Sequence, residues 1–298
     1  MYMMHMLVRH GSAAQKARYL PGIASGDIRF QSFGVTEPST GSNTLELKST
    51  AVRSGDRYIV NGQKIWTSRA LHSDLMTLLV RTTPLDKIQR RTEGLSILLV
   101  DIKASIGKGL TIRPIETMVN HQTNEVFFDN LEVPAGNLIG VEGKGFSYIL
   151  DGLNSERILL SHESVGDARF FIDKAVAYAK ERVVFGRPIG QNQGVQFPLA
   201  RAYSEYRAAD LLTRAGAALF QAGQHCGEEA NIARLQSAEC AWNAAEACMQ
   251  THGGFGVARE YDIERKWRAA RIQCIAPIST NLILAYIGHG VLGLPKSY

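Results

Sequence analysis

Cysteine is scarce in this sequence of 298 residues, and the spacing of the cysteines argues against a structural zinc site and against a disulfide framework. The four cysteines, Cys226, Cys240, Cys248 and Cys274, form no Cys-x-x-Cys pair. Structural zinc sites and disulfide frameworks both depend on close, regular cysteine spacings. The sequence therefore predicts no metal site and no disulfide network, and reduced thiols in a cytoplasmic protein are the expectation.

Long apolar runs and blocks of like charge are missing as well. The N-terminal residues lack the apolar core of a signal peptide, and the uncharged stretch 274–295 is interrupted by proline, polar residues and glycine. We therefore expect no membrane span, and we predict a buried helix with an irregular lead-in for this stretch. The net charge of +5 includes one basic cluster, 265–271. This cluster predicts a solvated helix face, and nucleic acid is not an expected partner.

No Gly-x-Gly-x-x-Gly motif follows a strand pattern, and strands do not alternate with helices, so a Rossmann nucleotide site is not expected. Residues 30–133 are instead rich in β-branched residues, alternation and turn dipeptides such as Gly55-Asp56, which predict a sandwich or barrel. Within this region, Tyr58–Val60, Asn61-Gly62 and Lys64–Trp66 predict a strand, a turn and a strand.

The pattern changes after Gly140. Apolar residues recur at helical spacing, which predicts helices over 145–180, 197–222, 228–250 and 280–291. The predicted fold class is therefore α+β, with a β domain at 30–138 followed by an all-α bundle at 139–298. Residues 1–29 fit neither half, although Gln15–Pro21 predicts the end of a helix that stops at the proline.

Several short polar or glycine-rich segments are candidates for ligand contacts. The loop Thr36–Asn43 offers hydroxyl and backbone N–H donors, although a plain turn explains it as well. Trp66 lies at a predicted strand end, where a tryptophan is part of the core, part of the rim or a platform for a planar cofactor. The glycines that follow Gln250 either let a pyrophosphate approach the backbone closely or simply cap a helix.

Two further segments combine charge with apolar surroundings. Arg182 and Arg187 flank Phe185, so they either hold a phosphate and an aromatic ring or interact with a helix dipole. Glu156 stands among apolar residues, the setting in which a desolvated carboxylate becomes a general base. The alternative is that Glu156 and Arg157 form a charge pair in the first turn of a helix.

The order and spacing of these segments resemble the acyl-CoA dehydrogenase family. The matching motifs are Thr36-Glu37-Pro38-x-x-Gly41-Ser42, Lys64-x-Trp66, Arg182-x-x-Phe185-Gly186, Gln250-x-x-Gly253-Gly254, Asp129–Pro134 and Asn137–Gly140. The resemblance extends from Gln15 to the end of the sequence. It implies a middle β domain and a C-terminal four-helix bundle, with residues 1–29 as the remnant of an N-terminal helical domain.

The same resemblance implies an FAD-dependent oxidoreductase that acts on acyl-CoA. In this family a carboxylate base removes the α-proton of the thioester while the β-hydride passes to flavin N5. An electron-transfer flavoprotein then reoxidises the flavin. A homodimer or homotetramer and a role in fatty acid and lipid metabolism are further implications.

The family resemblance assigns residues of this sequence to different parts of FAD and of the acyl-CoA substrate. The resemblance assigns the isoalloxazine ring of FAD to Phe33, Val35, Thr36, Trp66 and Ser68. It assigns the adenosine-diphosphate part of the partner subunit's FAD to Arg182, Phe185, Gln193, Gln250, Gly253 and Gly254. It puts Thr280 on the near side of the FAD, and Ser42, Asn154 and Arg157 at the CoA or thioester end of the substrate.

Two positions compete for the catalytic base in this family. Many members carry it in a Tyr-Glu-Gly-Thr run before the last helix, where this sequence has 275–280 without a carboxylate. In isovaleryl-CoA and long-chain acyl-CoA dehydrogenases the base lies on the first bundle helix, in a Leu-Asp-Leu-Glu-Arg-like run. Leu153-Asn154-Ser155-Glu156-Arg157 is similar to that run, so Glu156 is the predicted base.

Three alternatives stay open at this point. A related flavoprotein could oxidise nitroalkanes or hydroxylate aromatic compounds with the same fold. A homologue of the alkylation response could bind DNA through the basic cluster 265–271. The sequence could also be an inactive, truncated fragment, because most of the family's N-terminal domain has no counterpart in it.

Overall fold

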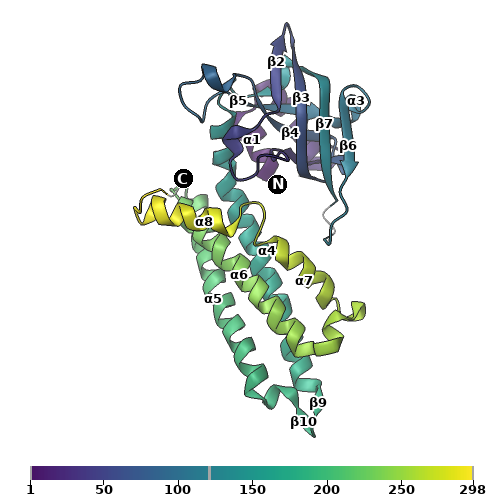
Figure 1. The fold of residues 1–298 in the computed structure, drawn as a ribbon, viewed down its shortest axis with the longest axis vertical. Coiled ribbons are helices and arrows are strands. Elements are labelled where there is room, and N and C mark those ends of the chain that lie inside the picture. The colour runs from purple at the N-terminus through teal and green to yellow at the C-terminus, as the bar shows by residue number, and fades with distance from the viewer. Residues whose placement is uncertain (1, 120–121, 297–298) are drawn as a thin grey trace. The chain divides into compact units, whose positions relative to one another are not determined.

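The computed structural model describes residues 2–119 and 122–296, and it divides into two compact units, Met1–Leu153 and Asn154–Tyr298. A sheet with short helices makes up the first unit, and long helices make up the second (Figure 1). The predicted α+β class, with a β domain followed by a helical region, is confirmed. The domain bounds 1–29, 30–138 and 139–298 stay predictions.

Two helices precede the sheet, α1 (Tyr2–His10) and α2 (Ala13–Ser25). The prediction that a helix stops at Pro21 is wrong, because α2 continues to Ser25 and ends at Gly26 in the left-handed conformation. Tertiary contacts outweigh the hydrogen bond that the proline removes. The side chain of Gln15 donates to the carbonyls of residues 136 and 138, and Tyr19 is buried in the core.

The sheet of the first unit is mixed, and its strands lie in the order β6-β7-β3-β2-β4-β5-β8, with β1 parallel to β4. Its strands are β1 (Phe30–Gly34), β2 (Thr50–Ser54), β3 (Arg57–Ser68), β4 (Leu75–Arg81), β5 (Leu95–Asp101), β6 (Leu110–Pro114), β7 (Thr123–Pro134) and β8 (Leu138–Ile139). One helical turn, α3 (Ile102–Ser105), follows β5. Short 3₁₀ segments lie at Thr44–Glu46, Ala70–His72, Leu85–Lys87 and Ala135–Asn137.

Two neighbouring strands of the sheet, β4 and β5, are buried on both faces. All of β4 is buried, and alternate residues of it enter two different cores: Met76 packs with β3, β6 and β7, while Leu79 packs with α1 and α2. Met6 and Leu7 of α1 belong to this second core. His10 at the end of α1 stacks on Tyr148, with ring centroids 4.0 Å apart. The N-terminal segment that matched neither predicted half therefore completes the core of the first unit.

The turn predicted at Asn61-Gly62 is wrong. β3 runs unbroken through this dipeptide, and its register with β7 shifts between Val60 and Gly62, which is a β-bulge. Gly62 has φ 141°, and a Cβ on it would lie 2.4 Å from the Ser49 hydroxyl oxygen. The hairpin turn is at the other predicted dipeptide, Gly55-Asp56, which joins β2 to β3. A glycine in a strand thus marks a close approach of two backbones rather than a turn.

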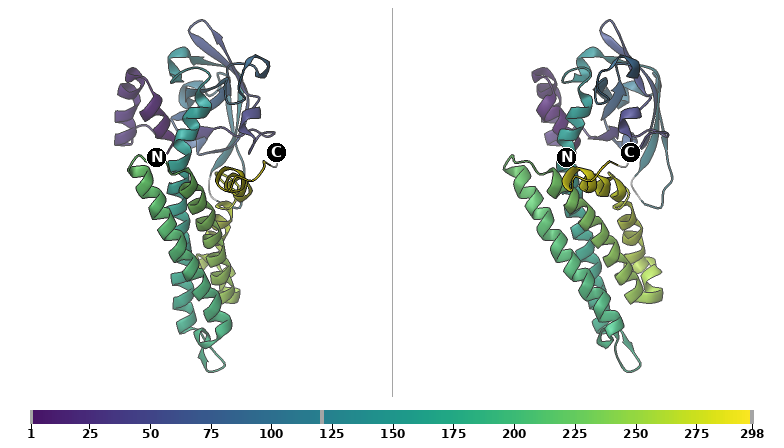
Figure 2. Two further views of the ribbon diagram at one scale, coloured as in Figure 1. Left: turned by 90° about the vertical axis from the view of Figure 1, so that its left-hand side faces the viewer. Right: turned by 60° about the vertical axis from the view of Figure 1, so that its left-hand side comes forward.

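The second unit is built on long helices that lie side by side (Figure 2). They are α4 (Gly145–Glu181), α5 (Gln193–Gln221) and α6 (Gly227–His252). The shorter α7 (Ile263–Ile272) shares their core, so four helices form the bundle that the resemblance implies. A hairpin of β9 (Val183–Val184) and β10 (Arg187–Pro188) joins α4 to α5, and 3₁₀ segments lie at Ile189–Gln191, Gly253–Val257 and Arg259–Tyr261. Alanines dominate the core and let the helices approach closely.

The C-terminal stretch differs from the prediction of a buried helix. It forms α8 (Thr280–Tyr286) and a π-helical turn (Ile287–Val291). Ile283 is buried, but the side chains of Leu284 and Leu292 are 52% and 67% exposed. Ile283 is the only buried residue of α8, so most of this short helix is at least partly accessible to solvent. Within residues 2–119 and 122–296, none of the helices has the length and apolar character that a membrane crossing requires.

The bulge at Gly62 makes a prediction about stability. We expect Gly62→Ala to lower the free energy of unfolding by about 2 kcal/mol, because the new Cβ would collide with Ser49 in a backbone conformation that L-residues avoid. Urea unfolding followed by circular dichroism measures this. The control is Gly136→Ala, whose Cβ would meet nothing within 4 Å and whose cost should stay below about 0.5 kcal/mol. Equal costs for the two variants would contradict the interpretation.

Candidate functional site

A buried ion pair fastens the loop between β1 and β2. Glu37 in this loop and Lys64 on β3 are both buried, and the Lys64 ammonium nitrogen lies 2.8 Å from a Glu37 carboxylate oxygen. Burial lowers the pKa of Lys64 to about 8. Desolvation acts to raise the pKa of Glu37, but the neighbouring ammonium ion outweighs it, and the net shift is downward. At neutral pH both groups therefore carry their charges inside the unit.

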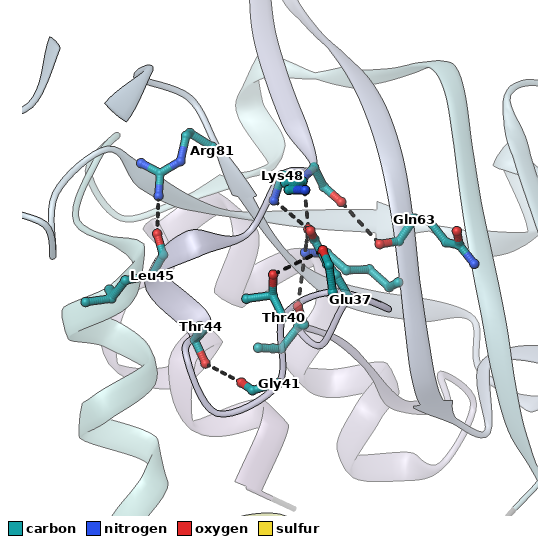
Figure 3. Close-up of polar contacts among 12 residues, drawn as sticks. Glu37, Thr40, Gly41, Thr44, Leu45, Lys48, Gln63 and Arg81 are labelled. Carbon is teal, nitrogen blue, oxygen red and sulfur yellow. Dashed lines mark hydrogen bonds and ion pairs between the residues drawn. The ribbon is translucent and has the colours of Figure 1, made fainter. Parts of the chain in front are cut away.

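The same carboxylate also holds the far end of the loop. The backbone N–H groups of Lys48 and Ser49 donate to Glu37 at 2.6 and 2.8 Å, and Figure 3 shows the Glu37 carboxylate turned toward this backbone. Arg81 on β4 donates to the carbonyl oxygen of Leu45, which fastens the middle of the loop. The two ends of a polar loop are thus joined through one buried carboxylate.

A second bulge in β3 turns Trp66 toward solvent. The register with β7 shifts between Lys64 and Thr67, and Trp66 takes a φ of 59° with its side chain 56% exposed. The backbone N–H of Ile65 donates instead to the carbonyl oxygen of Thr36, at 2.9 Å. Bulges beside functional sites commonly re-aim a side chain in this way. The result is an accessible aromatic face on β3, linked by its backbone to Thr36.

In the second unit, the ends of α4 and α6 line a pocket of about 620 Å³. Its lining residues are Tyr178, Arg182, Val184, Ile189, Gln250, Thr251, His252, Gly253, Gly254, Phe255, Ala258 and Glu260. The Arg182 guanidinium lies 5.7 Å from the centre of the Phe255 ring. A Cβ on Gly253 or Gly254 would meet nothing within 4 Å, so the backbone there is open to an incoming group. A cation, accessible backbone and aromatic rings are the chemistry that suits a nucleotide diphosphate.

The hairpin beside this pocket carries an exposed aromatic ring. Phe185 and Gly186 form its two-residue turn with φ values of 51° and 75°, as in a type I′ turn. Phe185 is 100% exposed. A bulky residue in the left-handed region is strained, and strain of this kind gathers at binding sites. Phe185 is therefore available to another molecule.

Glu156 is buried on α4 beside Arg157. Because α4 begins at Gly145, Glu156 lies about three turns inside the helix, and the alternative of a first-turn charge pair is wrong. Burial lowers the pKa of Arg157, and the Glu156 carboxylate opposes that shift. Arg157 donates to the side-chain oxygen of Asn154 at 2.9 Å. Two of the three residues predicted at the CoA or thioester end, Asn154 and Arg157, are thus neighbours of the predicted base on one helix, whereas Ser42 lies in the loop between β1 and β2.

The basic cluster 265–271 on α7 is engaged with partners inside its own unit. The pairs are Arg265 with Asp262, Lys266 with Asp167, Arg268 with Glu264, and Arg271 with the ring of Trp242. DNA binding requires cations that are available to neutralise phosphates and so displace the counterions condensed on the DNA. The arrangement does not favour the DNA-binding alternative.

Comparison with known proteins identifies the family. The family model for the acyl-CoA dehydrogenase middle domain matches residues 32–131, and the model for the C-terminal domain matches residues 143–289. An acyl-CoA dehydrogenase of Mycobacterium tuberculosis is 35% identical over 98% of this chain and 75% of its own length. The chain belongs to the acyl-CoA dehydrogenase family. The resemblance stated from the motifs is confirmed.

Further comparisons agree with membership of the acyl-CoA dehydrogenase family. An acyl-CoA dehydrogenase of Bacillus subtilis is 36% identical over 95% of this chain and 73% of its own length. The crystal structure of an acyl-CoA dehydrogenase from Geobacillus kaustophilus matches with a TM-score of 0.92 and 31% identity, covering 96% of this chain and 74% of that one. Members of this family are FAD-dependent oxidoreductases, as predicted.

The residues present fit the FAD that acyl-CoA dehydrogenases use. The pocket of the second unit offers a guanidinium and open glycine backbone for a pyrophosphate, and Phe185 is exposed as a stacking surface. In the first unit the bulged Trp66 offers a ring face to an isoalloxazine. Among the described residues, no cluster of His, Cys, Asp and Glu side chains is arranged to hold a metal ion.

The structure brings some of the predicted acyl-CoA dehydrogenase site residues together. Those that line the pocket of the second unit are Arg182, Gln250, Gly253 and Gly254. Gln193 begins α5 outside this lining, and Thr280 is the first residue of α8. In the first unit, Phe33 and Val35 pack half-buried against the core, whereas Ser42 and Ser68 are exposed. The individual roles of these residues stay predictions.

Sequence reasoning missed the buried charges that organise the site regions. Arg234 on α6 is 1% exposed and donates to the Ser164 hydroxyl and the Gln273 side chain. It also donates to three backbone carbonyls, those of Leu160, Gln273 and Ala276. It thereby ties α4 and α6 to the segment that precedes α8. An arginine within an alanine-rich helical face, and Lys64 at an inward strand position, were the available signals.

Arg234 makes the second prediction. Arg234→Ala should lower the free energy of unfolding by about 3 kcal/mol, because several buried carbonyl and hydroxyl groups lose their donor at once. Urea unfolding followed by circular dichroism gives the value. Arg201→Ala, at an exposed position of α5, is the matched control and should change it by less than about 0.5 kcal/mol. A cost below about 1 kcal/mol for Arg234→Ala would contradict this interpretation.

Proposed function

We propose that this chain is an FAD-dependent acyl-CoA dehydrogenase that introduces an α,β double bond into an acyl-CoA thioester, with Glu156 as the base. The observation that carries the proposal is a buried carboxylate on α4, next to Arg157 and Asn154, in a family member without a carboxylate at 275–280. We further propose a short, branched or medium acyl chain as the substrate.

The proposed chemistry explains why a buried base is needed. The α-C–H bond of a thioester is too weakly acidic for water to break quickly, so a positioned carboxylate must accept the proton. Glu156 accepts this proton on its carboxylate, while Arg157 and Asn154, which are hydrogen-bonded to each other, hold the thioester end. Hydrogen bonds that strengthen as charge develops on the carbonyl oxygen lower the barrier. Bound FAD supplies the acceptor for the β-hydride.

The cofactor in this proposal contacts two sets of residues. Phe33, Val35, Thr36, Trp66 and Ser68 would hold the isoalloxazine, and Thr280 would also contact FAD. The pocket residues Arg182, Gln250, Gly253 and Gly254, with Phe185 and Gln193, hold the adenosine-diphosphate part of the partner subunit's FAD. The full exposure of Phe185 and the open glycines support this arrangement. A homodimer or homotetramer follows from a shared cofactor.

The remaining parts of the proposal concern the setting of the reaction. An electron-transfer flavoprotein accepts the electrons, and the reaction belongs to fatty acid breakdown in the cytoplasm. Membership of the acyl-CoA dehydrogenase family supports the place of the reaction in fatty acid metabolism.

Glu156→Gln tests the base directly. The variant should keep its FAD but lose flavin reduction by acyl-CoA by about 10²–10⁴-fold, because a carboxamide cannot accept the α-proton. Bleaching of the flavin absorption band after mixing with butyryl-CoA or isovaleryl-CoA measures the rate.

Glu163→Gln, an exposed change on the same helix, is the control and should bleach like the wild type. Rapid bleaching of Glu156→Gln would refute the assignment. Bleaching of the wild type by a nitroalkane but not by any acyl-CoA would favour the alternative chemistry on the same fold.

Phe185→Ala tests the shared cofactor. The dissociation constant for FAD should rise about tenfold, because one aromatic stacking contact with the adenine is lost. The thermal midpoint of the FAD-free chain should not change, since a fully exposed ring contributes nothing to its core. Phe197→Ala, another exposed aromatic position, serves as the control. Unchanged FAD affinity in Phe185→Ala would argue against this contact.

A further inference from the structure

The buried pair of Glu37 and Lys64 has more polar contacts than the stability of the sheet requires. Lys64 donates to the carbonyl oxygen of Val35 at 3.1 Å as well as to Glu37. Glu37 accepts from the backbone N–H groups of Lys48 and Ser49, so four hydrogen bonds involve these two side chains. Removing two charges from water is costly, and apolar residues of similar volume would hold a sheet as well. The pair therefore points to a need for exact local geometry.

The residues next to this pair are those proposed to contact the flavin. Glu37 directly follows Thr36, and Lys64 stands two residues before Trp66. Between the two segments, the Ile65 backbone donates to Thr36 at 2.9 Å. A displacement of either charged side chain would therefore move Thr36 and the bulge that carries Trp66.

We infer that Glu37 and Lys64 are positioning residues for the flavin, which hold Thr36 and Trp66 at the separation that the isoalloxazine requires. Neither side chain needs to touch the cofactor, because both act through the backbone of their neighbours. The inference rests on the proposed function, since that proposal puts the flavin at Thr36 and Trp66.

Replacing one or both partners separates positioning from stability. Glu37→Gln and Lys64→Met each leave one buried group without its counter-charge, so both should lower the urea midpoint. The double variant Glu37→Gln/Lys64→Met removes both charges and should recover most of that midpoint. Its dissociation constant for FAD should nevertheless stay about tenfold above the wild-type value, because the bond to Val35 is lost and a carboxamide keeps only one of the two acceptor oxygens that hold the loop. A double variant that binds FAD like the wild type would overturn the inference.

Limited trypsin digestion gives a readout that needs no FAD. The peptide bond after Lys48 is a tryptic site, and the N–H of this bond belongs to Ser49 and donates to Glu37. In Glu37→Gln this anchor is weakened, so the fragment that ends at Lys48 should form at least about tenfold faster. The control is Glu132→Gln, which removes an exposed partner of Arg57 on the same strand as Lys64. Equal cleavage rates at Lys48 in the two variants would contradict a loop held by Glu37.

The pH dependence of FAD binding gives a third readout. The pKa of Lys64 is lowered to about 8 by burial, so at pH 9 its ammonium group is mostly neutral and the ion pair is lost. Glu37 also acts on the Arg81 guanidinium, and Glu46 acts on that guanidinium as well. The FAD affinity of the wild type should fall several-fold between pH 7 and pH 9. The fall should be smaller in Lys64→Met, because this variant has no amine at position 64 to titrate. If the ratio of the FAD dissociation constants at pH 9 and pH 7 were the same in the wild type and in Lys64→Met, the role of Lys64 would be contradicted.

These outcomes separate the inference from the function on which it rests. A wild-type chain that binds no FAD would contradict the proposed function. A wild-type chain that binds FAD, with unchanged binding in the double variant, would contradict the positioning role alone.

Discussion

Charge buried away from water is the constraint on which both units depend, because an ion inside a protein is tolerated only when polar groups surround it. In the first unit, Glu37 and Lys64 satisfy each other and hold a loop closed. In the second unit, Arg234 is surrounded by carbonyl and hydroxyl oxygens of α4 and of the segment before α8. In both places the buried charge fixes backbone that an apolar core alone would leave less sharply defined.

The same constraint explains why the site regions are irregular. The bulge that exposes Trp66 and the left-handed turn that presents Phe185 are strained conformations, and each is held by neighbouring regular structure. The first lies on β3 where that strand pairs with β7, and the second lies on a hairpin between two long helices. Regular elements thus hold two exposed aromatic side chains in place. Stacking on a planar cofactor requires aromatic rings that are both accessible and held in position.

Local pattern was sufficient for much of the fold and for the family. Helical spacing of apolar residues predicted α4, α5 and α6 to within a few residues, and β-branched residues, alternation and turn dipeptides predicted a β-rich region where most of the strands lie. It was not sufficient where long-range contacts decide. Gly62 was interpreted as a turn because its close approach to Ser49, thirteen positions away in the chain, leaves no local signal. Helix α2 continued through Pro21 because Gln15 and Tyr19 are anchored by distant parts of the unit.

The sequence by itself determined the α+β class, the order of the motifs and the absence of a carboxylate at 275–280, because these are properties of residue type and spacing. Only the tertiary structure decided that Glu156 lies buried deep in a helix, that Arg182 and the glycines after Gln250 line one pocket, and that Glu37 meets Lys64. Burial and ion pairing arise between side chains that folding brings together, so no local window of sequence contains them.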